Sequence, residues 1–170
     1  DNFQSGNYSA WTLSGNGYDA VNTYQGNVSM RLDGLRQGAK ALSSQGYTNV
    51  SLSMDLGALY LVQGDYCYAE YSTNGGTSWS TLVLVGDGED TGALKRGTVS
   101  AGLDNNANLR VRFRAYTLYG HYCYGDNVVL TGTPASGGTS PAIAVTGSGT
   151  FGSVTVGGNA TSTLTVHNDG

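Results

Sequence analysis

The chain has 170 residues, a length that suits one domain or slightly more, and only 12% of them are charged. The formal net charge of −4 argues against nucleic acids and anionic membrane surfaces as partners, because both are bound chiefly through Lys and Arg. No apolar run approaches the ~20 residues that a membrane-spanning helix needs. The 27 glycines and 12 tyrosines favour short strands joined by tight turns over helices.

The first part of the chain predicts three strands after a turn-rich opening segment, residues 1–24. Apolar and polar side chains alternate in residues 27–32 and again in residues 49–56, as they do in half-buried strands. Asp33-Gly34 is a turn signal directly after the first of these strands. Residues 38–43 are a third, shorter candidate.

The middle of the chain predicts a hairpin followed by a long loop. Residues 65–72 and 82–85 flank Asn74-Gly75, and Asn-Gly between two strand patterns is the strongest short signal for a β-hairpin. Residues 86–108 are rich in Gly, Asp and Asn. We therefore expect a long loop there, with one short strand near residues 97–101.

The clearest strand of the chain is residues 109–115. Strict alternation directs four apolar side chains to the core and three arginines to the opposite face: Leu109, Val111, Phe113 and Ala115 against Arg110, Arg112 and Arg114. Residues 126–132 form a closing strand. Seven to nine short strands separated by turns indicate an all-β sandwich or barrel.

The composition changes after this closing strand. Residues 133–140 have the composition of a flexible linker, and new strand patterns follow at residues 143–145, 151–156 and 163–166. Residues 141–170 are too few for an independent sandwich. We therefore expect a first domain at residues 1–132 and, after the linker, a partial second β module.

The two cysteines, Cys67 and Cys123, each lie in the tripeptide Tyr-Cys-Tyr. A zinc site would need three or four ligands, and His121 is the only histidine near either cysteine. Two readings stay open, a pair of buried free thiols and one disulfide in an exported protein, and we favour the disulfide. It would close a loop of about 57 residues, which the chain-entropy model values at ~4 kcal/mol.

Three motifs mark residues 1–132: Asp1–Gln4, Tyr71–Trp79, and Arg110–Arg114 followed by Gly125–Val128. In these motifs the chain resembles bacterial extracellular jelly-roll domains related to MAM and choice-of-anchor J domains. The resemblance implies a jelly-roll-like β-sandwich of two antiparallel sheets. Such domains occur beside hydrolases, proteases and adhesins, so it also implies a secreted, extracellular bacterial parent with catalytic or repeat domains in the same chain.

Residues 141–145, 151–154 and 164–170 resemble the opening of a choice-of-anchor D module, an ASH-type, immunoglobulin-like domain. Such modules are usually tandem spacers. This second resemblance again implies a longer parent protein.

Eight of the twelve tyrosines fall within residues 60–71 and 116–124, which a Cys67–Cys123 disulfide would bring together. One reading is packing at the edge of the core. The other is a rigid surface on which sugar rings stack while hydroxyl and charged groups bind the sugar hydroxyls. On the second reading, the ligand-binding residues are Tyr66, Tyr68, Tyr119, Tyr122, Tyr124, Asp65, Glu70 and His121.

The row Arg110, Arg112 and Arg114 also has two readings. Three like charges side by side repel unless acids lie opposite, so the row can be a solvated face paired with Glu70 or other acids. Alternatively, Arg112 and its neighbours form a bidentate site for acidic ligands such as uronates or sulfated sugars.

The only cofactor that we expect is a structural calcium ion, and this rests on the resemblance. Many jelly rolls of this type tie the first strand to the last through Ca²⁺. By resemblance, Asp1 or Gln4 and Asp126 or Asn127 would supply the oxygen ligands. The alternative is ordinary turn chemistry without a metal.

No catalytic motif is visible in the sequence. A glycosidase needs two carboxylates at a defined separation, and no Gly-x-Ser-x-Gly elbow precedes a helix pattern. We therefore expect a non-catalytic accessory module of a secreted bacterial enzyme that binds a ligand, most simply a polysaccharide or other glycan. The alternative is a structural, adhesive or protein-contact spacer domain of a surface protein or secreted protease.

Overall fold

The computed structural model describes residues 1–135, 143–146, 156, 159 and 165–168. Contacts within the chain divide it into two units, Asp1–Thr133 and Pro134–Gly170. The described residues form strands and turns, without a helix. Among them there is consequently no apolar helix of the length that crosses a membrane.

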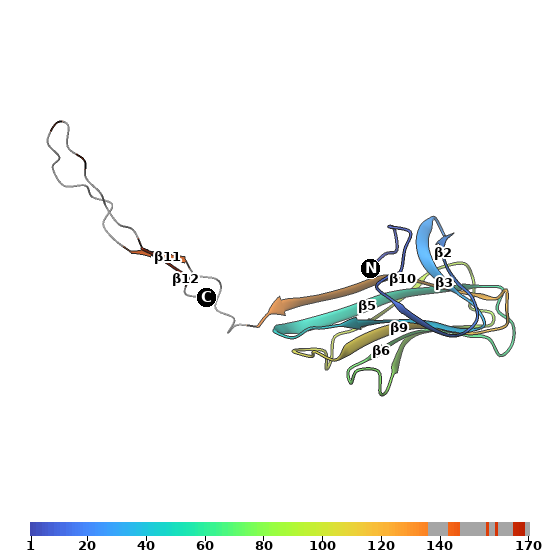
Figure 1. The fold of residues 1–170 in the computed structure, drawn as a ribbon. Coiled ribbons are helices and arrows are strands. Elements are labelled where there is room, and N and C mark those ends of the chain that lie inside the picture. The colour runs from blue at the N-terminus through green and yellow to red at the C-terminus, as the bar shows by residue number, and fades with distance from the viewer. Residues whose placement is uncertain (136–142, 147–155, 157–158, 160–164, 169–170) are drawn as a thin grey trace. The chain divides into compact units, whose positions relative to one another are not determined.

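The first unit is a sandwich of two five-stranded sheets (Figure 1). The first sheet has the order β1 (Thr12–Asn16), β4 (Leu35–Leu42), β9 (Leu109–Tyr116), β6 (Tyr66–Ser72) and β7 (Ser80–Gly86). The second has the order β2 (Asp19–Tyr24), β3 (Asn27–Leu32), β10 (Tyr122–Pro134), β5 (Tyr47–Leu59) and β8 (Lys95–Val99). The predicted all-β, antiparallel sandwich is confirmed.

Alternation along the central strands builds the core between the sheets. In β9 every second side chain from Leu109 to Ala115 is buried, and the arginines between them lie on the outer face. In β5 the inward set runs from Val50 to Ala58. The two inner faces meet in one cluster that includes Met30, Leu32, Val50, Leu52, Met54, Leu56, Val85, Val111 and Phe113.

Aromatic rings from the opening segment close one side of this core. Trp11 stacks on Phe113 with ring centroids 5.5 Å apart, and Phe3 packs against Trp11 at the same distance. Gly125 of β10 lies directly over the Phe113 ring, where an added Cβ would be 2.3 Å from Phe113 Cγ. A glycine is therefore required at this crossing of the sheets.

Two predictions about the elements need correction, and one is confirmed. The opening segment, predicted only as turn-rich, contains the edge strands β1 and β2. The short strand expected near residues 97–101 is present as β8, which starts at Lys95 and pairs with β5. The closing strand is longer than predicted: β10 begins at Tyr122 and runs through Pro134, into the predicted linker.

The second unit has two described strands, β11 (Ile143–Thr146) and β12 (Thr165–Asn168). They pair antiparallel, with Ile143 opposite Asn168. The strand predicted at residues 151–156 lies outside the described residues except for Val156. The immunoglobulin-like nature of residues 141–170 stays a prediction.

Candidate functional site

The Cys67–Cys123 disulfide is present, and it joins the two sheets. Cys67 lies in β6 of the first sheet and Cys123 in β10 of the second, with Cα atoms 5.5 Å apart and both side chains in the core. Since neighbours of an inward-facing residue in a strand face outward, the tyrosines on either side of the two cysteines point away from each other. The single tyrosine surface predicted from the sequence is wrong: the residues are divided between opposite faces.

The outer face of the first sheet holds the largest group of predicted ligand residues. Tyr66 and Tyr68 of β6 lie opposite Tyr116 and Arg114 of β9, and Tyr68 also lies opposite Leu84 of β7. Tyr66 and Tyr116 are 40% and 53% exposed, far more than rings that pack at a core edge. We call this surface the tyrosine–arginine face; its members are Gln37, Tyr66, Tyr68, Glu70, Trp79, Leu84, Arg110, Arg112, Arg114 and Tyr116.

At the centre of the tyrosine–arginine face, Glu70 binds two arginines. Arg112 Nε donates to Glu70 Oε2 at 2.6 Å, while Arg114 donates from Nε at 3.1 Å and from Nη2 at 3.2 Å. Burial alone would raise the pKa of Glu70, but these hydrogen bonds and the two positive charges hold that pKa below its ordinary value. The predicted pairing with Glu70 is confirmed for Arg112 and Arg114.

Each of the two guanidinium groups lies over an aromatic ring. The Arg114 guanidinium carbon lies 3.8 Å from the centroid of Tyr68, and that of Arg112 lies 4.2 Å from the centroid of Trp79. Arg112 also donates to Gln37 Oε1 at 3.2 Å. The polar centre of the face is thus fixed before any ligand arrives.

Two hollows lie at the Tyr66–Tyr116 end of this face. One, of about 250 Å³, is lined by Tyr66, Leu84, Gly86 and the loop from Gln63 to Asp65. The other, of about 340 Å³, lies on the other side of that loop and is lined by Leu35, Tyr116, Thr117 and Leu118. Rings and aliphatic side chains therefore surround two depressions that share one loop.

Asp65 and His121, both predicted as ligand residues, hold this loop in place. The buried Asp65 carboxylate accepts from the backbone N–H of Val62 and of Leu118, each at 3.1 Å, and lies 2.6 Å from His121 Nδ1. Burial favours a higher pKa for Asp65, yet these hydrogen bonds lower the pKa below its ordinary value. With these partners, Asp65 positions the loop, and its role as a ligand residue stays a prediction.

Tyr122 and Tyr124 lie on the outer face of the second sheet. Tyr124 is buried beneath Tyr24, whose ring stacks on it at 4.1 Å, and burial raises the pKa of Tyr124. Tyr122 contacts Tyr60 edge-on at 6.1 Å and carries the Arg31 guanidinium over its ring at 4.7 Å. For Tyr124 the core-edge reading is right.

Tyr119 belongs to neither sheet face. It lies in the loop between β9 and β10, where its ring meets Tyr18 edge-on at 5.6 Å. The predicted set is thus divided among the first sheet, the second sheet and the end loops.

The four predicted calcium ligands have separate partners. The Asp1 carboxylate accepts from Trp11 Nε1 at 3.0 Å and Lys40 Nζ at 3.1 Å. The Asn127 amide donates to Asp55 at 2.9 Å, and the exposed Gln4 amide donates to the Asn2 carbonyl at 3.4 Å. Asp126 is buried, which raises its pKa, and its carboxylate bonds its neighbour's N–H and, weakly, Ser29.

Across the described part of the chain, three or more His, Cys, Asp or Glu nowhere group as metal ligands do. Calcium binding stays a prediction.

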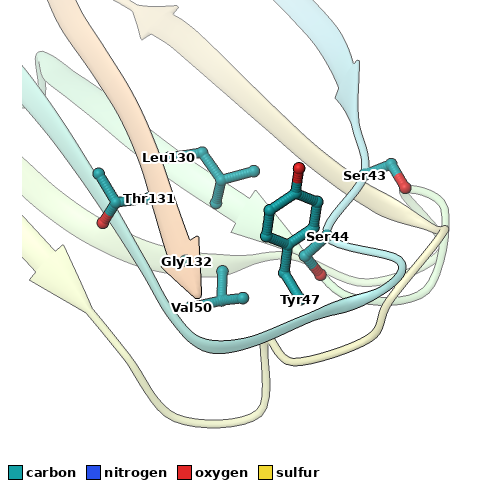
Figure 2. Close-up of a pocket in the computed structure, with 7 residues that line it drawn as sticks. All are labelled: Ser43, Ser44, Tyr47, Val50, Leu130, Thr131 and Gly132. Atoms are coloured by element: carbon teal, nitrogen blue, oxygen red, sulfur yellow. The ribbon is translucent and has the colours of Figure 1, made fainter. Parts of the chain in front are cut away.

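A further pocket, which the sequence did not indicate, lies where the β4–β5 turn and the start of β5 meet the end of β10 (Figure 2). It measures about 430 Å³ and is lined by Ser43, Ser44, Tyr47, Val50, Leu130, Thr131 and Gly132. Its serines already serve the fold: Ser44 donates to the carbonyl of Leu103, and Ser43 accepts from the N–H of Gln45. The walls of the pocket combine hydroxyl-bearing and apolar side chains.

No known protein-family profile matches the chain, and no curated protein matches it. Solved structures do. The module TmCBM61 in complex with β-1,4-galactotriose is 13% identical with a TM-score of 0.56, and the match covers 77% of this chain and 94% of that one. A C-terminal family 22 carbohydrate-binding module from a Clostridium thermocellum protein is 14% identical (TM-score 0.54; 80% and 92% covered).

The K3 cleaved adhesin domain of Lys-gingipain from Porphyromonas gingivalis is also similar, at 13% identity and a TM-score of 0.52, with 76% of this chain and 94% of that domain covered. At these identities the likeness concerns the fold. The first unit has the jelly-roll β-sandwich fold that these carbohydrate-binding modules and this adhesin domain share.

Proposed function

We propose that this chain is a non-catalytic accessory module that binds a polysaccharide on the tyrosine–arginine face, within a larger secreted bacterial protein. The observation that carries the proposal is the row of exposed rings, Tyr66 and Tyr116, beside the fixed polar centre around Glu70. Aromatic faces stack on the C–H groups of sugar rings, and the polar groups next to them bind sugar hydroxyls.

Preorganisation supports this reading. The guanidinium groups of Arg112 and Arg114 are held by Glu70 and by ring faces, and the disulfide fixes β6 against the opposite sheet. A ligand would therefore pay little ordering entropy on binding. The fold is that of modules whose solved structures contain galactotriose or are described as binding xylan, which supports the same ligand class.

The carboxylate of Glu70 favours binding over hydrolysis. Glu70 is the one acidic residue within the five strands of the first sheet, all of which the structure describes, and it is engaged by two arginines. Glycoside hydrolysis needs two carboxylates, one of them with a raised pKa. The lowered pKa of Glu70 is opposite to what a general acid requires.

The test is a retention assay of the purified chain on neutral, uronic and sulfated polysaccharides, with and without calcium. We expect at least one to retard the protein and Tyr66→Ala to weaken binding by about tenfold, since loss of one stacked ring costs roughly 1–3 kcal/mol in comparable base-stacking sites. Tyr47→Ala is the matched control, because Tyr47 is 45% exposed but lines the pocket at the end of β10. Equal losses of affinity in the two variants, or no retention on any polysaccharide, would contradict the proposal.

A protein-contact or adhesive role is the second candidate, and one observation favours it. Leu35 and Leu118 are 52% and 61% exposed beside Tyr116, so one end of the face is apolar as well as aromatic. Concentration-dependent association in sedimentation, abolished by Leu118→Ser, together with failure to bind any polysaccharide, would move the assignment to this role.

A further inference from the structure

The chain is acidic overall, yet three of its arginines lie in one row on one face. It has eight Lys and Arg residues, all of them among the described residues. Four are neutralised by a carboxylate of their own, in the pairs Arg36–Asp19, Lys40–Asp1, Lys95–Glu89 and Arg96–Asp55. The three arginines of β9 share a single carboxylate, that of Glu70.

Arg110 differs from the other two arginines of this row. It makes no ion pair with any residue in the part of the chain that the structure describes, whereas Arg112 and Arg114 divide the charge of Glu70 between them. Its side chain lies near Gly76 and Trp79 of the β6–β7 hairpin, since a Cβ added to Gly76 would be 3.4 Å from Arg110 Cδ and 3.3 Å from the Trp79 ring. The formal charge of the four groups on this face is therefore +2.

The guanidinium groups of Arg112 and Arg114 have further N–H donors beyond those that bind Glu70 and Gln37. Glu70 and Gln37 take Nε and Nη1 of Arg112, and Glu70 takes Nε and Nη2 of Arg114. The side chains of Arg112 and Arg114 keep 17% and 28% of their surface exposed. Guanidinium forks of this kind match the two oxygens of a carboxylate or sulfate, and the rings beneath them fix their orientation.

We propose that the polysaccharide bound on the tyrosine–arginine face is anionic, carrying carboxylate or sulfate groups that lie over Arg110, Arg112 and Arg114 while neighbouring sugar rings stack toward Tyr66 and Tyr116. This rests on the proposed function. The row of arginines and the row of tyrosines follow the same strands: Arg110 pairs with Ser72 at one end of β6, and Tyr116 pairs with Tyr66 at the other. Six residues of strand separate them, about 20 Å.

The charge around the face defines where the anionic groups would lie. Asp87 and Glu89 line the hollow beyond Tyr66, so that end repels anions, and Lys95 offsets only Glu89. The excess positive charge is at the Arg110 end. An anionic chain would therefore bind with its charged groups at the hairpin end and its ring faces at the tyrosine end.

The experiment measures the affinity of the full chain for polygalacturonate, dextran sulfate, xylan and galactan at low and raised ionic strength. We expect at least one of the two anionic polymers to bind tenfold or more tightly than either neutral one, and added salt to weaken it. Binding of polygalacturonate alone would identify carboxylate as the recognised group, and binding of dextran sulfate alone would identify sulfate.

Arg110→Gln is the informative variant, because it removes a charge without leaving Glu70 unpaired. We expect about fivefold weaker binding of the anionic polymer, the effect of one partly exposed ion pair, and no change in the melting temperature. Arg31→Gln is the matched control: Arg31 also makes no ion pair among the described residues, but it lies over Tyr122 on the opposite face.

The outcomes separate the two proposals. Tighter binding of xylan or galactan than of both anionic polymers, with loss in Tyr66→Ala but not in Arg110→Gln, would overturn the anionic preference and keep the polysaccharide function. Equal weakening by Arg110→Gln and Arg31→Gln would show attraction to net charge alone and would also overturn it. Failure of all four polymers to bind would overturn both.

Discussion

Glu70 shows how one side chain organises the outer face of the first sheet. Its side chain is 6% exposed, and its two oxygens accept hydrogen bonds from Arg112 and Arg114. A buried carboxylate without partners would be costly, and three arginines in one row would repel each other. The arginines supply hydrogen bonds to the buried carboxylate, and its negative charge reduces the repulsion among the arginines. The result is a rigid polar centre between the rings of Tyr68 and Trp79.

We predict that Glu70→Gln lowers the free energy of unfolding by about 2 kcal/mol at pH 7, since it leaves two partly buried arginines without their carboxylate. The folded pKa of Glu70 is lowered, so its contribution is complete above the unfolded pKa near 4.5 and is lost as the pH falls through the folded value. The difference between wild type and variant should therefore shrink below about pH 4.5. Urea unfolding at several pH values measures it.

Glu89→Gln is the control for this prediction. Glu89 makes the same kind of pair with Lys95, but at the surface, and its replacement should change stability little. An effect of Glu89→Gln as large as that of Glu70→Gln, or a Glu70→Gln effect that grows toward acid pH, would contradict the account.

At the scale of elements, the disulfide determines which residues can act together. It joins β6 to β10 across the core, and the two cysteines are 56 positions apart in the sequence. The tyrosines beside it face outward from different sheets, so Tyr66 and Tyr122 cannot bind one ligand ring together. The two faces are separate surfaces held at a fixed distance.

We predict that the double variant Cys67→Ala with Cys123→Ala loses about 4 kcal/mol of unfolding free energy, because the cross-link restricts a long loop of the unfolded chain. The denaturant dependence of unfolding should also steepen, since the unfolded chain becomes more expanded. Guanidinium unfolding monitored by tyrosine fluorescence checks both. A loss below about 1 kcal/mol would mean that the packing of the two sheets alone holds β6 and β10 together.

Strands with one buried face were predictable, and their neighbours in space were not. Residues 109–115 alternate so regularly that both the strand and its inward side could be assigned, and the cysteine pair was also assigned from the sequence. The edge strands β1 and β2 were missed because they are short and mostly polar, with partly exposed residues. Apolar and polar side chains therefore alternate only weakly along them.

The site was predictable only within single strands. Tyr66, Tyr68 and Glu70 could be placed on one face by period-two alternation. Tyr116, Leu84 and Gln37 were missed, because the sheet order β4-β9-β6-β7 and its register bring them there, and neither is encoded in local spacing. The same limit produced the incorrect single tyrosine surface.

At the scale of the whole molecule, the first unit contains the complete core, both sheets and the disulfide. We predict that a chain ending at Pro134, the last residue of β10, unfolds cooperatively with the same melting temperature as the full chain. Differential scanning calorimetry compares the two. A melting temperature lower by more than about 5 °C would show that residues beyond 134 stabilise the sandwich, since that shift corresponds to roughly 1–2 kcal/mol.

The central claim is that a polysaccharide binds the tyrosine–arginine face, and backbone NMR shift mapping tests it most directly. The labelled chain is titrated with oligosaccharides prepared from whichever polymer retards it. The account predicts that shift changes concentrate on β6, β9 and the Gln63–Asp65 loop, and that Tyr66→Ala reduces them. Changes confined to the pocket of Tyr47 and Leu130, or to the opposite face around Tyr60 and Tyr122, would contradict it.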